Sequence, residues 1–227
     1  MELFKALKSQ IEYLQAWGIK YVYTTEGIKK FLQSKGEDLG ESDWDALQNA
    51  VLSCKKCSLH RVRKRPVWGE GSSENRLMLV SEYPSPDEDF YGKPFVGSVG
   101  NLLNRMLLAI GLRKEDFFIT PAVKCKTPGG RPPDEEEVSA CKPYLIKQIK
   151  LLKPKLILAM GFTPPKMFFE KGTTFSAIRG KVFYFKDEVP VFFTYHPAYV
   201  LKNPAIKRVV WEDLQEFKKL VEKVLNQ

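Results

Sequence analysis

Four short apolar runs, separated by segments with a helical pattern, restrict what this chain can fold into more than any other feature of the sequence. The runs span residues 77–81, 117–123, 156–160 and 191–195. Helical patterns lie between them at residues 102–110, 134–152 and 164–170. Strands that alternate with helices predict a parallel sheet with helices on both faces. We therefore expect a three-layer α/β/α fold with a central, mostly parallel four-stranded sheet.

The segments outside this alternation complete the outline. Residues 181–185 and 189–194, joined by three polar residues, predict a hairpin at one edge of the sheet. Residues 207–225 carry apolar side chains at helical spacing and predict an amphipathic C-terminal helix. Residues 1–41 also read as helical but contain no motif tied to chemistry, so we expect a helical N-terminal extension there. The main domain is then expected at residues 42–227, with Ser42 as the N-cap of its first helix.

The stretch from Ser81 to Gly100, SEYPSPDEDFYGKPFVGSVG, is the first candidate for a functional site. It follows one expected strand and precedes a helix, where open α/β sheets place their ligand sites. Loops of this length without secondary structure are uncommon unless they are functional or disordered. Glycines at 97 and 100 would let the backbone approach a ligand closely. An ordinary surface loop is the competing interpretation, but the apolar Pro94-Phe95-Val96 does not suit a solvated linker.

The formal net charge of +9 suits a polyanionic partner, although a lysine- and glutamate-rich surface of the thermophile kind would also explain it. A dense basic run is more specific, and we expect phosphate contacts from its members Arg61, Arg63, Lys64 and Arg65. No run of 18 or more apolar residues is present in the 227-residue chain, so no transmembrane helix is expected. The N-terminus lacks the uninterrupted apolar core of a signal peptide. We expect a cytoplasmic monomer without membrane contact.

All four cysteines stand at informative positions. Cys54 and Cys57 form a C-x-x-C pair, Cys125 follows the second expected strand, and Cys141 lies in the next helix. Two disulfides are an unlikely use of these residues in a cytoplasmic chain. A C-x-x-C pair suits chelation of one metal centre, and the loop between Cys125 and Cys141 would let those two thiols meet it. Four thiolates fit either zinc or an iron–sulfur cluster, and the spacing alone does not choose between them.

Two motifs resemble those of a known family. The first is Glu82-x-Pro84, followed by Glu88-Asp89-x-x-Gly92-x-Pro94-Phe95-Val96-Gly97 and by Gly100 and Leu102-Leu103. The second is His196-Pro197-Ala198 directly after the last expected strand. Together with the four cysteine positions, these motifs resemble the type-4, iron–sulfur-containing uracil-DNA glycosylases over roughly residues 43 to 220.

The resemblance implies a [4Fe–4S] cluster held by Cys54, Cys57, Cys125 and Cys141. Its expected role is structural, because it would tie the N-terminal helix of the main domain to the loop after the second strand. The resemblance also implies that the partner is DNA containing uracil or another deaminated base.

A base-flipping mechanism assigns the remaining roles. The target base leaves the duplex and enters a pocket, where the resemblance implies that Phe95 stacks on it. We expect His196 to donate a hydrogen bond to the base oxygen that gains negative charge, and Glu82 to orient the attacking water. The segment after His196 matches the family's loop that wedges into the duplex, and its expected contact residues are Val200, Leu201 and Lys202.

The chain departs from the family pattern at the expected substrate-binding residues. Ser81, Tyr83 and Ser85 replace three small residues in the first motif. Pro121 stands where the family carries a base-reading Asn, and proline has no polar side-chain atom. Despite these departures, the resemblance as a whole predicts a DNA repair glycosylase that hydrolyses the N-glycosidic bond of uracil or another deaminated base. A catalytically weak or inactive DNA-binding protein of the same fold is the alternative, because of Pro121, and a four-cysteine zinc protein is disfavoured by the first motif.

Overall fold

The computed structural model describes residues 41–71, 76–169, 173–186 and 188–225, and the expected N-terminal helical extension lies outside these residues except for Glu41. The division of the chain near residue 41 stays a prediction. Among the described residues, none of the helices combines the length and apolarity that crossing a bilayer requires. All the elements below belong to the part of the chain from residue 40 onward.

The sheet has five strands in the order β2-β1-β3-β5-β4. These are β1 (Leu77–Ser81), β2 (Phe117–Pro121), β3 (Leu156–Met160), β4 (Val182–Phe185) and β5 (Val189–Thr194). Three pairings are parallel, and β4 pairs antiparallel with β5. The α/β class and the edge hairpin are confirmed. The count of four strands is wrong by one, because the hairpin adds β4 to the sheet.

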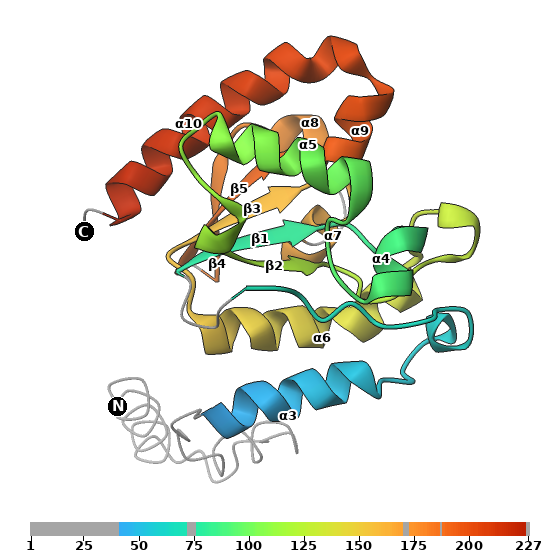
Figure 1. Cartoon of the computed structure of the whole chain (residues 1–227). Helices are drawn as coiled ribbons and strands as arrows, with labels where there is room; N and C mark the ends of the chain where they lie inside the picture. Colours follow the sequence, from blue (N-terminus) through green and yellow to red (C-terminus); the bar gives the residue numbers. More distant parts are fainter. Residues whose placement is uncertain (1–40, 72–75, 170–172, 187, 226–227) are drawn as a thin grey trace, which may run out of the picture. The chain divides into compact units, whose positions relative to one another are not determined.

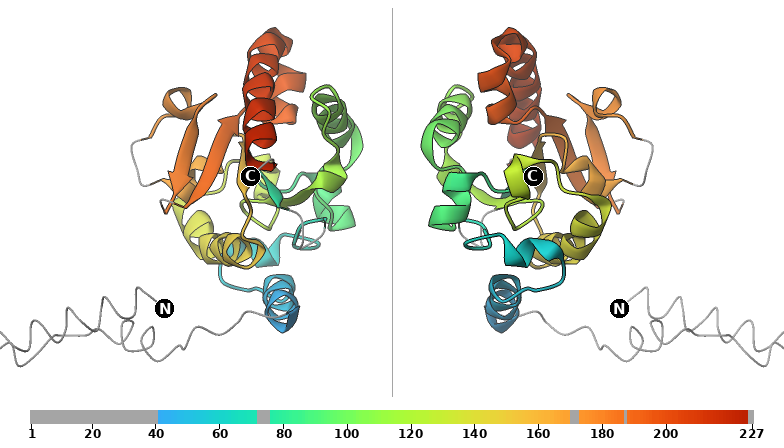
Figure 2. Two further views of the ribbon diagram at one scale, coloured as in Figure 1. Left: turned by 90° about the vertical axis from the view of Figure 1, so that its left-hand side faces the viewer. Right: turned by 90° about the vertical axis from the view of Figure 1, so that its right-hand side faces the viewer.

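The helices form a layer on each face of this sheet (Figures 1 and 2). Figure 1 shows α5 (Gly97–Leu108) and α10 (Lys207–Leu225) on one face and α6 (Glu135–Leu152) on the other, with α3 (Glu41–Leu52) packed outside α6. The expected C-terminal helix agrees with α10 at both ends. The short helices are α4 (Pro86–Tyr91), α7 (Pro165–Phe168), α8 (Phe175–Ile178) and α9 (Pro197–Lys202), and the 3₁₀ turns are η1 (Ser58–Arg61), η2 (Lys114–Asp116), η3 (Pro128–Gly130) and η4 (Pro204–Ile206).

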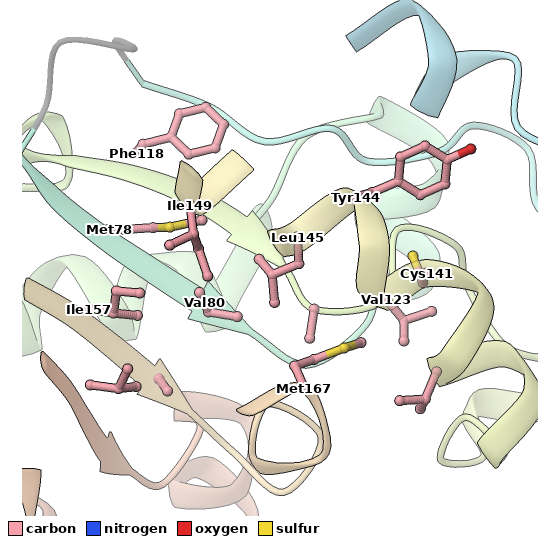
Figure 3. Close-up of a cluster of buried hydrophobic side chains, with 14 of the residues drawn as sticks. Met78, Val80, Phe118, Val123, Cys141, Tyr144, Leu145, Ile149, Ile157 and Met167 are labelled. Carbon is pink, nitrogen blue, oxygen red and sulfur yellow. The ribbon is translucent and has the colours of Figure 1, made fainter. Parts of the chain in front are cut away.

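Strand β1 shows why the two helical layers form. Its five residues are all buried, and neighbouring side chains go to opposite faces. Met78 and Val80 join the core under α6, whereas Leu77 and Leu79 join the core under α5 and α10. Figure 3 shows the first of these cores, which continues along α6 as far as Cys141. Parallel strands that are buried on both faces need apolar side chains at every position.

Three expected boundaries differ from the structure. Helix α3 begins at Glu41, so Ser42 lies inside the helix and is not its N-cap. Strand β2 ends at Pro121 instead of residue 123, although the Ala122 and Val123 N–H groups still donate to the Ser81 and Glu82 carbonyls. The expected loop from 81 to 100 contains α4, and α5 already begins at Gly97.

The sequence does carry the signal for α4. Ser85 and Glu88 form a reciprocal capping box, in which each side chain accepts the backbone N–H of the other residue. Pro86 stands at the first helical position, and Gly92 ends the helix at a φ of 70°. Thus six of the twenty residues of the expected loop form a capped helix that orders the first motif.

Candidate active site and cysteine cavity

A cavity of about 390 Å³ lies where the carboxyl ends of β1, β3 and β5 meet. The residues after β1 form one wall with Glu82, Tyr83 and Ser85, and the segment after β5 forms another with His196, Tyr199 and Lys202. Phe162 after β3 and the η3 glycines, 129 and 130, close the remaining sides. The fold therefore brings both sequence motifs to one cavity, as the parallel sheet predicts.

Phe95, the residue expected to stack on the base, is only 3% exposed and packs behind His196 without lining the cavity that the described residues form. An unusual backbone holds it there. Its φ is 52°, in the left-handed region that side chains rarely adopt. The Glu88 carboxylate stabilises this conformation by accepting the Phe95 backbone N–H through Oε1, while Oε2 accepts the Ser85 N–H. A Cβ on Gly100 would lie 1.8 Å from the Phe95 carbonyl oxygen, so residue 100 must be glycine. Glu88 thus has a structural role, and Gly100 serves the packing of Phe95.

His196 is oriented by its position at the N-cap of α9. Its Nδ1 accepts the backbone N–H of Ala198 at 3.2 Å, which leaves the proton of the neutral ring on Nε2. The imidazole stacks on the Phe95 ring, with 5.2 Å between the ring centroids and 20° between the planes. Desolvation by burial lowers the pKa of His196 to about 4. The ring is therefore a neutral hydrogen-bond donor at physiological pH.

Glu82 lines the same cavity as His196. The turn after β3 orients its carboxylate through hydrogen bonds. Its Oε1 accepts the backbone N–H of Phe162 at 2.8 Å and of Thr163 at 3.3 Å. Burial raises the pKa of this carboxyl, and the two N–H donors act in the opposite direction. A Cβ on Gly161 would lie 2.4 Å from Glu82 Cγ, so the turn can approach the carboxylate only with glycine there. A carboxyl with a raised pKa inside a cavity suits a role as a base.

The expected base-contacting residues divide into two groups. Tyr83 and Ser85 line the cavity, and the Tyr83 hydroxyl donates to the Gly130 carbonyl at 3.2 Å. Ser81 and Pro121 are paired with each other at the buried ends of β1 and β2, and neither lines the cavity in the described part of the chain. Pro121 presents a backbone carbonyl, but that oxygen already accepts a hydrogen bond from Lys124 Nζ at 2.7 Å.

Lys124 is a buried residue that the sequence did not single out as functional. Its Nζ donates to Thr120 Oγ1 at 2.6 Å, to the Pro121 carbonyl and to Gln148 Oε1 at 2.7 Å. Burial lowers its pKa to about 7. The ammonium joins the end of β2 to α6 through Gln148, which donates in turn to the Trp68 carbonyl at 3.1 Å. In the sequence, the position of Lys124 directly before Cys125 is the signal for this hydrogen-bond network.

A second cavity collects all four cysteines. Cys54 follows α3, Cys57 is the N-cap of η1, Cys125 follows β2 and Cys141 lies in α6. All four are free thiols. Within the described residues, no three His, Cys, Asp or Glu side chains form a group that could hold a single metal ion. The thiols instead surround a shared space.

The surroundings of these sulfurs supply hydrogen-bond donors. Arg63 Nη1 donates to Cys125 Sγ at 2.9 Å, and the Lys124 backbone N–H donates to Cys141 Sγ at 3.3 Å. Burial raises the pKa of Cys125 and raises the pKa of Cys141 to about 12. These two thiols therefore stay protonated unless a strong positive charge, such as that of a metal centre, displaces the protons.

The structure separates the residues that were expected to contact DNA. Arg61, Lys64 and Arg65 are exposed, but Arg63 points inward and also donates to the Cys54 carbonyl at 2.7 Å. The expected wedge residues lie in α9 instead of a loop. Val200 is only 3% exposed, so it has no free surface for a duplex, whereas Leu201 is 43% exposed and Lys202 is exposed as well.

Comparisons with known proteins agree with this arrangement. Residues 68–215 match the family model described as "Uracil DNA glycosylase superfamily". The chain is 42% identical to a type-4 uracil-DNA glycosylase of Sulfurisphaera tokodaii, over 78% of this chain and 84% of the relative. It is 41% identical to a type-4 uracil-DNA glycosylase of Pyrobaculum aerophilum, over 77% of this chain and 93% of the relative. A type-4 uracil-DNA glycosylase of Thermotoga maritima is 36% identical, over 79% of this chain and 95% of the relative.

Proposed function

Because this chain belongs to the type-4 uracil-DNA glycosylases and is a DNA glycosylase, we propose that it excises uracil from DNA at the cavity between Glu82 and His196. The observation that carries the proposal is the orientation of His196. Its Nδ1 is occupied by the Ala198 N–H, so Nε2–H is the group left to donate into the cavity. The alternative of an inactive DNA-binding protein finds no support in the comparisons, since the relatives at 36–42% identity carry the name of the enzyme.

The base site is the first part of the proposed mechanism. A flipped nucleotide brings its base into the cavity, where it lies against His196, whose ring is backed by the buried ring of Phe95. Breaking the bond between the sugar C1′ and the base nitrogen leaves the bonding electron pair on the base. The neutral His196 Nε2–H donates to the base oxygen on which that charge develops, which lowers the barrier.

Water attack is the second part. The sugar becomes electron-deficient as the base departs, and a water oxygen forms the new bond to C1′. The Glu82 carboxylate is oriented by the Phe162 and Thr163 N–H groups and by the Thr163 side chain, and we assign to it the role of holding that water and accepting its proton. A carboxyl whose pKa is raised by burial is a stronger base than an exposed glutamate. The products are the free base and an abasic sugar.

The cysteine cavity fits a [4Fe–4S] cluster. Four thiols surround one space, and three of the sulfurs receive hydrogen bonds, as the thiolate ligands of such clusters do. We assign Cys54, Cys57, Cys125 and Cys141 as the ligands. When bound, the cluster would supply a structural cross-link between α3, η1, the end of β2 and α6. Arg63 and Lys124 position two of the ligands through their hydrogen bonds.

DNA is the proposed partner, with exposed Arg61, Lys64 and Arg65 as phosphate contacts and Leu201 and Lys202 as contacts beside the flipped nucleotide. A monomeric state and a cytoplasmic location stay predictions.

The test is an excision assay on oligonucleotides that carry uracil, hypoxanthine, xanthine or a mismatched thymine. We expect abasic sites at uracil, scored by alkaline cleavage. The four substrates share one flanking sequence, so differences in rate report the base alone. If abasic sites form at hypoxanthine or xanthine but not at uracil, the substrate assignment is wrong, and if they form at none of the four bases the proposed activity is wrong.

A further inference from the structure

Two large aromatic side chains lie exposed next to each other at the end of α4. Phe90 is 53% exposed and Tyr91 is 60% exposed. Their rings contact edge to face, with 5.0 Å between the centroids. They fill the two unconstrained positions of the first motif, Glu88-Asp89-x-x-Gly92, so the mechanism described above makes no use of them. Adjacent large aromatic rings that stay exposed on a protein surface commonly mark a site that a ligand or partner covers.

Cationic side chains from another segment flank these rings. Lys64 Nζ lies over the Phe90 ring, 4.7 Å from its centroid. Arg65 passes beside the end of α4, since a Cβ on Gly92 would lie 3.5 Å from Arg65 Cδ. Lys64 and Arg65 are both exposed. We call Lys64, Arg65, Phe90 and Tyr91 the α4 patch.

A buried carboxylate fixes the two halves of the α4 patch against each other. Asp89 is 1% exposed and accepts the Lys64 backbone N–H through both oxygens, at 2.9 and 3.0 Å. It also accepts the Arg65 N–H at 3.4 Å. Asp89 immediately precedes Phe90, so the rings and the cations are held in register before any ligand binds. Such preorganisation lowers the entropy lost on binding.

The α4 patch lies at the same end of the sheet as the active-site cavity (Figure 1). Helix α4 begins at that cavity, which is lined by Ser85, Pro86 and Glu88. Its six residues extend about 9 Å, at the usual rise of an α-helix. A strand that enters the cavity with one nucleotide would therefore pass close to the α4 patch with its neighbours.

We propose that the α4 patch binds single-stranded DNA next to the flipped nucleotide, by stacking unpaired bases on Phe90 and Tyr91 while Lys64 and Arg65 contact phosphates. Aromatic faces between cations are the arrangement that single-strand binding surfaces use, because every base has a face to stack. Charge complementarity favours a nucleic acid over an apolar protein partner, since both cations of the α4 patch are exposed to solvent. The inference rests on the proposed function for the position of the flipped base, but not for the binding itself.

The test compares affinities for a fluorescent oligothymidylate without uracil, measured by anisotropy with the full chain. The double variant Phe90→Ala/Tyr91→Ala should bind about fivefold or more weakly than wild type, as the loss of base stacking requires. The same variant should lose much less affinity for a fully paired duplex, whose bases offer no free faces. Tyr184→Ala is the matched control, because Tyr184 is 65% exposed on β4 at the far edge of the sheet and should leave both affinities unchanged.

Each outcome separates this inference from the proposed function. Because the oligonucleotide contains no uracil, a selective loss of single-strand affinity supports the α4 patch even if wild type excises no uracil. Equal single-strand affinity in wild type and the double variant overturns it, even if uracil excision is fast. A change from dimer to monomer in the double variant, with DNA affinity intact, overturns it as well and assigns the surface to a second copy of the chain.

Discussion

Phe95 and His196 come from opposite halves of the chain, and their rings lie stacked on each other at the active-site cavity. Phe95 is held there by Glu88 and by the absence of a side chain at Gly100, and His196 by the N-terminus of α9. Phe95 covers one side of the imidazole, and burial of this ring is the cause of its lowered pKa. A neutral donor at a fixed place is what a departing anionic base requires.

The first prediction concerns His196. Replacing it with Ala should lower the single-turnover rate of uracil excision by roughly 10²–10³-fold, the usual effect of losing one such donor. Affinity for the substrate should change little, because the other cavity residues and the exposed cations proposed to contact phosphates remain. With a pKa of about 4, His196 stays neutral from pH 5.5 to pH 8, so it should contribute no inflection to the rate in that range. An inflection near pH 6.5 that disappears in the Ala variant would contradict the lowered pKa.

The second prediction concerns Glu82. Replacing it with Gln should lower the single-turnover rate by about 10²-fold or more, as expected for the loss of a general base. Protonation of Glu82 at low pH should reduce the wild-type rate. Because burial raises the pKa of Glu82, this loss should begin at a higher pH than it would for an exposed glutamate. The raised pKa also means that Glu82 makes the fold less stable as the pH rises above about 4.5, since the unfolded carboxyl ionises first. Glu70→Gln, at an exposed carboxylate, is the control and should keep the wild-type profile.

The third prediction separates Arg63 from Arg61. Arg61→Ala should reduce the slope of log affinity for duplex DNA against log salt by about 0.9, since one phosphate contact is lost. Arg63→Ala should leave the slope unchanged, because its guanidinium faces Cys125 and the Cys54 carbonyl. The Arg63 variant should instead lose iron faster in the presence of a chelator. A reduced salt slope in the Arg63 variant would mean that this side chain reaches DNA.

The fourth prediction concerns the metal centre. Protein purified without oxygen should be brown and contain about four irons per chain, as a cuboidal cluster requires. Cys141→Ser should lower the iron content and the thermal unfolding midpoint together, since a structural metal site contributes directly to folding. Ser139→Ala, at an exposed position of the same helix, should change neither quantity. Colourless protein with one zinc per chain would refute the cluster.

The fifth prediction concerns Pro121. An Asn side chain has both a donor and an acceptor for the edge of uracil, and such a paired contact is worth about 1–3 kcal/mol of discrimination. The Pro121 carbonyl is occupied by Lys124, so the strand end offers no equivalent contact through that oxygen. Pro121 does not line the cavity, but its partner Ser81 directly precedes the cavity residue Glu82, and an Asn side chain reaches further than the proline ring. Pro121→Asn should therefore raise the rate of uracil excision on single-stranded and U·G substrates. If wild type is already as fast as the Asn variant, another group in the cavity reads the base.

The sequence by itself determined the α/β class, the edge hairpin, the C-terminal helix and the family, because these depend on patterns that are local in the chain. Apolar runs bounded by polar turns gave β1 and β3 at their observed limits, and the spacing of the motifs placed Glu82 and His196 at the ends of strands. Even α4 was encoded locally, through the capping box of Ser85 and Glu88.

Only the tertiary structure decided how neighbouring residues divide their roles. Arg61 and Arg63 are alike in sequence, but the side chain of Arg63 turns toward Cys125, which lies on a distant segment. Val200 and Leu201 are both apolar, and the packing of α9 buries one and exposes the other. These outcomes depend on contacts between segments far apart in the chain, and neither propensity nor periodicity contains that information.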